Sequence, residues 1–148
     1  MTTDKATKCD WKYHGLTVFQ LGNQEWIIGT RKQFRKAAIA TAKEELWSFK
    51  ADYLADFLER KNCFQAKWSM REWQNFINTL RQMQEKMCED ANPIIKAFLG
   101  SHLEEFVEGA IDADGVGHFL NSYDGELHET KDIEGLNKGF GPLCVRIN

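Results

Sequence analysis

Two short apolar runs around a Gly-Asn turn constrain the fold of this chain most. Residues 16–21 and 26–28 are apolar in the main, and Gly22-Asn23 lies between them. This spacing predicts an antiparallel β-hairpin. Residues 142–148 end in the alternating apolar and polar side chains of Val145-Arg-Ile-Asn148, which is typical of a closing strand. The two ends of the chain therefore predict strands of one antiparallel sheet.

Helical patterns fill most of the sequence between these ends. Thr30 and Gln33 stand at the N-cap and N3 positions of a capping box, and apolar residues then recur at steps of three or four. We expect one long amphipathic helix that ends near Arg60. Three further helix starts are marked by a capping box or a proline: Ser69 with Glu72, Asn92-Pro93, and Ser101 with Glu104.

These elements predict an α+β fold. We expect the N-terminal hairpin and the C-terminal strands to form a small antiparallel sheet, with about four helices packed against it. Residues 118–120 are expected to add a short strand. Residues 1–10 are polar and are expected to be a flexible tail, which leaves residues 11–148 as a single domain.

Composition excludes several classes of protein. A formal net charge of −3 argues against general nucleic-acid binding. No apolar run approaches the roughly 20 residues of a membrane span, and the polar first ten residues indicate no signal peptide. The cysteines lack the spacing of a zinc site or a disulfide framework, so we expect reduced thiols in a cytoplasm. They are Cys9, Cys63, Cys88 and Cys144.

Residues 112–126 carry the densest mixture of glycine, aromatic and ionisable side chains in the chain. A segment this rich in turn-forming residues and polar side chains is typical of a binding site or of a tight structural corner, and both interpretations stay open. Gly115 and Gly117 are expected to adopt positive φ in a turn that caps a helix.

A metal site is not expected in this segment. Asp112 and Asp114 have the spacing of the first ligands of an EF-hand loop. However, Val116 and Tyr123 stand where that loop needs its fifth and twelfth positions to supply oxygen ligands. We therefore predict neither a bound metal nor any other cofactor.

Catalytic residues are not expected either, although one enzyme alternative remains. His118 with Asp124 or Glu126 would place a base beside an acid, as in a small hydrolase or nucleotide-modifying enzyme. No nucleophile elbow, metal-binding H-E-x-x-H motif or phosphate-binding loop accompanies them.

Small-ligand binding is the next possibility for the same region. Phe119 and Tyr123 are suited to stack on a base, and Arg146 to grip a phosphate with its two-pronged guanidinium. His128 and Asn148 would read polar edges of the ligand. The alternative is that Phe119 is a core residue, that Tyr123 is packed, and that Arg146 pairs with a nearby carboxylate.

Charge and aromatic content suggest protein partners. Residues 101–134 contain ten acidic side chains against one basic side chain, Lys131. Such an acidic face suits docking onto a basic, nucleic-acid-binding surface of another protein, although it is also typical of a solvated face. Its predicted partner-binding residues are Glu104, Glu105, Glu108, Asp112 and Asp114.

The helices hold more aromatic side chains than one apolar stripe needs, which predicts a homodimer through the helices. These side chains are Trp47, Phe49, Trp68, Trp73 and Phe76.

Several sequence segments together resemble those of a family of small accessory proteins of tailed bacteriophages. They are Glu45-Leu-Trp-Ser-Phe49, Cys88-Glu-Asp-Ala-Asn92, Phe106-Val-Glu-Gly-Ala-Ile-Asp-Ala-Asp-Gly115, Gly117-His-Phe-Leu-Asn-Ser-Tyr-Asp-Gly-Glu126 and Val145-Arg-Ile-Asn148. The resemblance implies a non-enzymatic counter-defence protein that acts in the host cytoplasm by stoichiometric binding. Its target would be a host defence protein, as for anti-CRISPR inhibitors, or a cyclic or modified nucleotide signal, as for anti-Thoeris sponges.

Overall fold

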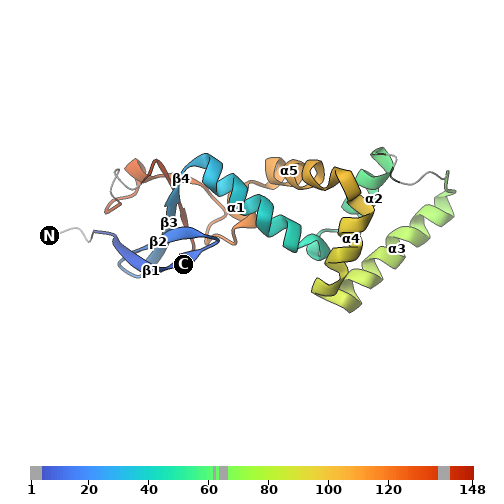
Figure 1. Ribbon diagram of the computed structural model, residues 1–148, viewed down its shortest axis with the longest axis horizontal. Helices are drawn as coiled ribbons and strands as arrows, with labels where there is room; N and C mark the ends of the chain where they lie inside the picture. The colour runs from blue at the N-terminus through green and yellow to red at the C-terminus, as the bar shows by residue number, and fades with distance from the viewer. Residues whose placement is uncertain (1–4, 62, 64–66, 137–140) are drawn as a thin grey trace. The chain divides into compact units, whose positions relative to one another are not determined.

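The computed structural model describes residues 5–61, 63, 67–136 and 141–148 (Figure 1). Where the sequence predicts one domain, the chain groups into two compact units. The first unit contains Met1–Thr41 and Ala110–Asn148, and the second contains Ala42–Gly109. Among the described residues, no helix is both long and apolar enough to cross a membrane. Each unit is described by itself below.

A five-stranded antiparallel sheet lies in the first unit, with its strands in the order β1-β2-β3-β5-β4. Its strands are β1 (Thr7–Tyr13), β2 (Leu16–Leu21), β3 (Gln24–Gly29), β4 (His128–Glu129) and β5 (Leu143–Arg146). The predicted hairpin is β2–β3, with Gly22 at a φ of 59° in its turn. The predicted closing strand is β5, which pairs with both β3 and β4. The predicted α+β class and antiparallel sheet are thus confirmed.

Strand β1 corrects the expectation of a tail over residues 1–10. Thr7 pairs with Gln20 and Lys8 with Phe19, so the chain is ordered as a sheet edge from Thr7 onward. All seven side chains of β1 are exposed or half-buried. A strand without a buried face shows no alternating hydrophobic pattern, which is why the sequence did not reveal it. Residues 1–4 lie outside the described part of the chain.

Both faces of the sheet are buried at its centre. Phe19, Trp26, Ile28 and Cys144 share one face, where they form a cluster with Leu136. Neighbouring residues in the same strands point the other way because side chains alternate along a strand. These residues are also fully buried, and they are Val18, Ile27 and Val145.

The Thr30–Gln33 capping box opens helix α1 (Arg31–Glu44), as predicted. The Gln33 N–H donates to Thr30 Oγ1 at 3.1 Å, and the Thr30 N–H donates to Gln33 Oε1 at 2.8 Å. Helix α1 nevertheless ends at Glu44, and a 3-10 turn (Leu46–Ser48) separates it from α2 (Ala51–Arg60). The prediction of one long helix to Arg60 is therefore wrong.

The strand predicted over residues 118–120 is also wrong, because this segment forms the short helix α6 (Val116–Phe119). Gly115 has a φ of 87° and separates α6 from α5 (Leu103–Asp114). Phe119 and Leu120 are adjacent and both are buried, which one turn of helix allows. In a strand, these two side chains would point to opposite faces.

Gly117 is helical, against the expectation of a positive φ, and a different constraint applies to it. A Cβ atom there would lie 2.5 Å from the main-chain oxygen of Gly125. The corner between α6 and the following turn therefore depends on the absence of a side chain at Gly117.

In the second unit, a short 3-10 turn precedes three of the α-helices. Its remaining elements are α3 (Met70–Met87), a 3-10 turn (Cys88–Ala91), α4 (Asn92–Leu99) and a 3-10 turn (Gly100–His102). The Ser69–Glu72 capping box is confirmed, with both hydrogen bonds at 3.2 Å. Ser101 was expected to cap α5, but it lies inside the turn and α5 begins at Leu103.

Candidate functional site

Tyr123 and Arg146 stack on one another in the predicted site region. The Arg146 guanidinium lies 3.9 Å from the centre of the Tyr123 ring, and Tyr123 is 65% exposed. The Tyr123 N–H donates to the main-chain oxygen of Arg146 at 2.7 Å. This bond holds the loop after α6 against the end of β5, so the ring and the guanidinium are aligned by the backbone.

Asp124 and His128 meet beside this pair. Nε2 of His128 lies 2.7 Å from Oδ2 of Asp124, and the Glu126 N–H donates to Oδ1 of Asp124 at 3.0 Å. Partial burial opposes ionisation of Asp124, but the hydrogen bonds from His128 and Glu126 outweigh it and lower the pKa of Asp124. The His128 ring also packs edge-on against Trp26 of β3, with ring centres 5.6 Å apart.

Arg146 and Asn148, near the end of β5, make further contacts beside this pair. Nε of Arg146 donates to the main-chain oxygen of Asn148 at 3.0 Å. The Asn148 side-chain amide donates to Oε1 of Glu25 at 2.8 Å. Glu25, Tyr123, Asp124, His128, Arg146 and Asn148 thus form a group at one edge of the sheet, the sheet rim. Several of its polar side chains already hydrogen-bond to other residues of the rim.

The structure thus brings together four of the five residues predicted to bind a ligand, namely Tyr123, His128, Arg146 and Asn148. Phe119 is the exception: it is 5% exposed and lies in the core, as the alternative interpretation had it. It has no accessible ring face on which a base could stack, so Tyr123 is the exposed aromatic of the site.

The residues of the enzyme alternative are arranged differently from the expectation. His118 is exposed on α6 with its ring against Phe119, and the histidine that meets Asp124 is His128. Asp124, Glu126 and His128 each offer one metal-ligating atom, and these atoms lie within 4.8 Å of one another. They are the described residues best placed to hold a metal ion, whereas Asp112 and Asp114 end helix α5.

The acidic side chains of α5 are largely paired within their own unit. In the first unit, Arg35 donates to Asp112 at 2.9 Å. In the second, Lys43 pairs with Glu104, and Lys61 pairs with Glu105. The hydrogen bond from Lys61 lowers the pKa of Glu105. The predicted acidic face is therefore partly neutralised; its remaining members, Glu108 and Asp114, are exposed.

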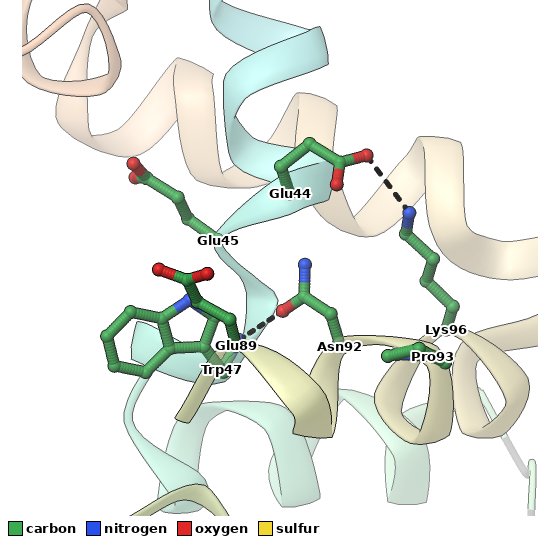
Figure 2. Close-up of a pocket in the computed structure, with 7 residues that line it drawn as sticks. All are labelled: Glu44, Glu45, Trp47, Glu89, Asn92, Pro93 and Lys96. Carbon is green, nitrogen blue, oxygen red and sulfur yellow. Dashed lines mark hydrogen bonds and ion pairs between the residues drawn. The ribbon is translucent and has the colours of Figure 1, made fainter. Parts of the chain in front are cut away.

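A pocket of about 530 Å³ opens in the second unit, and the sequence interpretation missed it (Figure 2). Its wall includes the Trp47 indole and the Glu44–Lys96 ion pair, whose atoms are 3.2 Å apart. Asn92 lies at its base and Pro93 beside it. Two further carboxylates line it, those of Glu45 and Glu89. Trp47 was noted only as a surplus aromatic, and the signal that could have marked it is Asn92, a polar residue among apolar neighbours in the sequence.

The other surplus aromatics gather on α3 and beside it. Trp68, Trp73 and Phe76 lie with ring centres 5.1–5.9 Å apart, and Phe76 contacts Phe98 of α4. Phe49 instead packs on Phe106. The homodimer through the helices stays a prediction.

Comparison with known proteins identifies no relative: no family model, no curated protein and no solved structure matches the chain.

Proposed function

We propose that this chain is a non-enzymatic, phage-encoded binding protein that neutralises a host defence component by stoichiometric binding in the host cytoplasm. The observation that supports it most is the exposed Tyr123 ring with the Arg146 guanidinium stacked 3.9 Å away. Tyrosine and arginine, with tryptophan, are the residue types enriched among the few side chains that dominate binding energy at protein interfaces. Because the Tyr123–Arg146 main-chain bond fixes the backbone and the two side chains stack on one another, less conformational entropy is lost when a partner binds.

A protein target fits the sheet rim better than a nucleotide signal. The guanidinium of Arg146 is already stacked on Tyr123 and its Nε is bound to Asn148. The carboxylates of Glu25 and Asp124 belong to the same rim, and they would repel the phosphates of a nucleotide. A protein surface can instead supply an apolar contact for the Tyr123 ring and hydrogen-bond partners for the rim.

The experiment is affinity purification of the tagged chain from bacterial lysate, followed by native mass spectrometry of the eluate. We expect a host protein in a fixed molar ratio, lost with Tyr123→Ala and with Arg146→Ala. Tyr123→Phe keeps the ring and should retain the partner. Arg71→Ala, on an exposed position of α3, is the matched control. Thermal unfolding of each variant shows whether the fold is kept.

Two results would contradict the proposal. Release of a small nucleotide in place of a protein would show a sponge. Chemical change of a candidate ligand, lost in His118→Ala or Asp124→Asn while ligand affinity is kept, would show the enzyme alternative.

A further inference from the structure

The pocket beside Trp47 has the chemistry of a receptor for a cationic side chain, and it is separate in sequence from the sheet rim. We propose that it binds an arginine side chain presented by a protein partner, with the guanidinium stacked on the Trp47 indole and paired with Glu45 and Glu89. This inference does not depend on the proposed function, because the rim residues belong to the other unit.

Charge is the first argument for a cationic ligand. The pocket is lined by three glutamates and one lysine, which leaves a net charge of −2. Lys96 is paired with Glu44 at 3.2 Å, so that carboxylate is already neutralised. In the part of the chain that the structure describes, Glu45 and Glu89 form no ion pair. A cation that enters the pocket therefore meets two carboxylates without displacing a lysine.

The indole of Trp47 is the second argument. Its ring is half-buried and lines the pocket, and in Figure 2 it lies on the same side as Glu45 and Glu89, with the Glu44–Lys96 pair on the other side. The face of an indole attracts cations through its quadrupole, and tryptophan does so more strongly than any other aromatic side chain. An aromatic face flanked by carboxylates is the combination that a guanidinium can satisfy at once.

The site is also rigid at its centre. The main-chain N–H of Trp47 donates to Oδ1 of Asn92 at 2.9 Å, and the Asn92 side-chain amide donates to the main-chain oxygen of Lys43 at 3.1 Å. Asn92 is 6% exposed, so the backbone that carries Glu45 and Trp47 is fixed to the start of α4. The backbone that carries the aromatic wall, and Asn92 at the base of the pocket, are thus fixed before any ligand arrives.

Arginine fits better than lysine for a geometric reason. A guanidinium is planar, so it can lie flat on the indole and still direct N–H groups sideways to two carboxylates. An ammonium is a compact, strongly hydrated charge, and it gains less from an aromatic face at an exposed site. The pocket is therefore expected to prefer arginine over lysine by about fivefold in affinity.

The test is a titration of the full-length ¹⁵N-labelled chain with three matched pentapeptides, observed at the tryptophan indole N–H signals. The central residue of the peptides is arginine, lysine or citrulline, which has the shape of arginine without its charge. Trp47→Phe assigns the Trp47 indole signal. We expect the arginine peptide to shift this signal in a saturable manner, the lysine peptide to bind about fivefold more weakly, and the citrulline peptide to leave the signal unmoved.

The variants separate the pocket from general acidity of the surface. Glu45→Gln and Glu89→Gln should each weaken the arginine peptide about threefold to tenfold. Glu59→Gln removes an exposed carboxylate from α2, outside the pocket, and should change nothing. Equal shifts with arginine and citrulline peptides, or equal loss with Glu59→Gln, would overturn the proposal. A failure of these peptides leaves the Tyr123 and Arg146 results intact, so the two proposals are tested separately.

Discussion

The side-chain amide of Asn92 takes the place of a helical hydrogen-bond partner of Trp47. In a continuous helix the N–H of residue 47 would donate to the C=O of residue 43. Here the Trp47 N–H donates to Oδ1 of Asn92 at 2.9 Å, and Nδ2 of Asn92 donates to the Lys43 oxygen at 3.1 Å. One amide thus satisfies both groups while the chain leaves the helix. This exchange permits the break between α1 and α2 and places Trp47 in the wall of the pocket.

Replacing Asn92 should therefore destabilise the fold. We expect Asn92→Ala to lower the free energy of unfolding by about 2–4 kcal/mol, because it removes a buried amide and leaves the partly buried N–H of Trp47 and C=O of Lys43 without their partner. Urea unfolding followed by circular dichroism measures this loss. Asn75→Ala, at an exposed position of α3, is the control and should stay within about 0.5 kcal/mol of the wild type. A similar small change in Asn92→Ala would show that the exchange carries no stability.

Gly117 and Gly109 should respond in opposite directions to the same substitution. Gly117→Ala places a methyl group 2.5 Å from the Gly125 oxygen, and we expect a loss of about 1–3 kcal/mol. Gly109 lies in α5 with nothing within 4 Å of its Cβ position, so Gly109→Ala should stabilise by about 0.5–1 kcal/mol. Thermal unfolding compares the two variants. Stabilisation by Gly117→Ala would contradict the packing at this corner.

Cys144 should be inert in the folded protein. Burial, with smaller contributions from the charges of Asp124 and Asp132, raises the pKa of Cys144 to about 12. Because the thiolate is the reactive form, iodoacetamide at pH 8 should modify exposed Cys88 and spare Cys144. Peptide mass spectrometry after native labelling measures both sites, and labelling in urea should modify both. Equal native rates at Cys88 and Cys144 would contradict the burial of β5.

The Asp124–His128 pair should make stability depend on pH in the acid range. The pKa of Asp124 is lowered in the folded state, so the unfolded chain takes up the proton first as the pH falls. Its stabilisation is present above the ordinary value of 3.8 and is lost as the pH falls through the lowered pKa.

We therefore expect Asp124→Asn to lower the free energy of unfolding by about 1 kcal/mol at pH 7, and by almost nothing at a pH below the lowered pKa of Asp124. Urea unfolding across pH 2.5–7 measures the difference, with Asp114→Asn at an exposed position as the control. A constant difference across this range would show that the carboxylate charge is not involved.

Local signals in the sequence predicted much of the fold. The β2–β3 hairpin and the capping boxes at Thr30 and Ser69 depend on neighbours within a few residues, and all three are present in the structure. The break after Glu44 was missed because its cause, Asn92, lies more than forty residues away in the chain. Helical periodicity continues across the break, so pattern alone could not show it.

The sequence also predicted part of the candidate site. Tyr123, His128, Arg146 and Asn148 were expected to bind one ligand. The pairing of β4 with β5 and the main-chain bond from Tyr123 to Arg146 bring them to one rim. The partner of Asp124 was expected to be His118, but that residue lies on α6 with its ring against Phe119, and His128 meets Asp124 instead. The pocket was missed because its lining comes from two segments that sequence patterns do not connect.

The sequence by itself determined the elements whose energies are local: turn residues, capping boxes, apolar periodicity and the strand alternation of residues 142–148. Tertiary structure decided which side chains replace main-chain partners and which exposed groups meet. Asn92 breaks a helix only when α4 brings it to Lys43 and Trp47, and Arg146 stacks on Tyr123 only when the loop after α6 pairs with β5. Such contacts depend on distances between residues far apart in the chain, and local propensity carries no information about them.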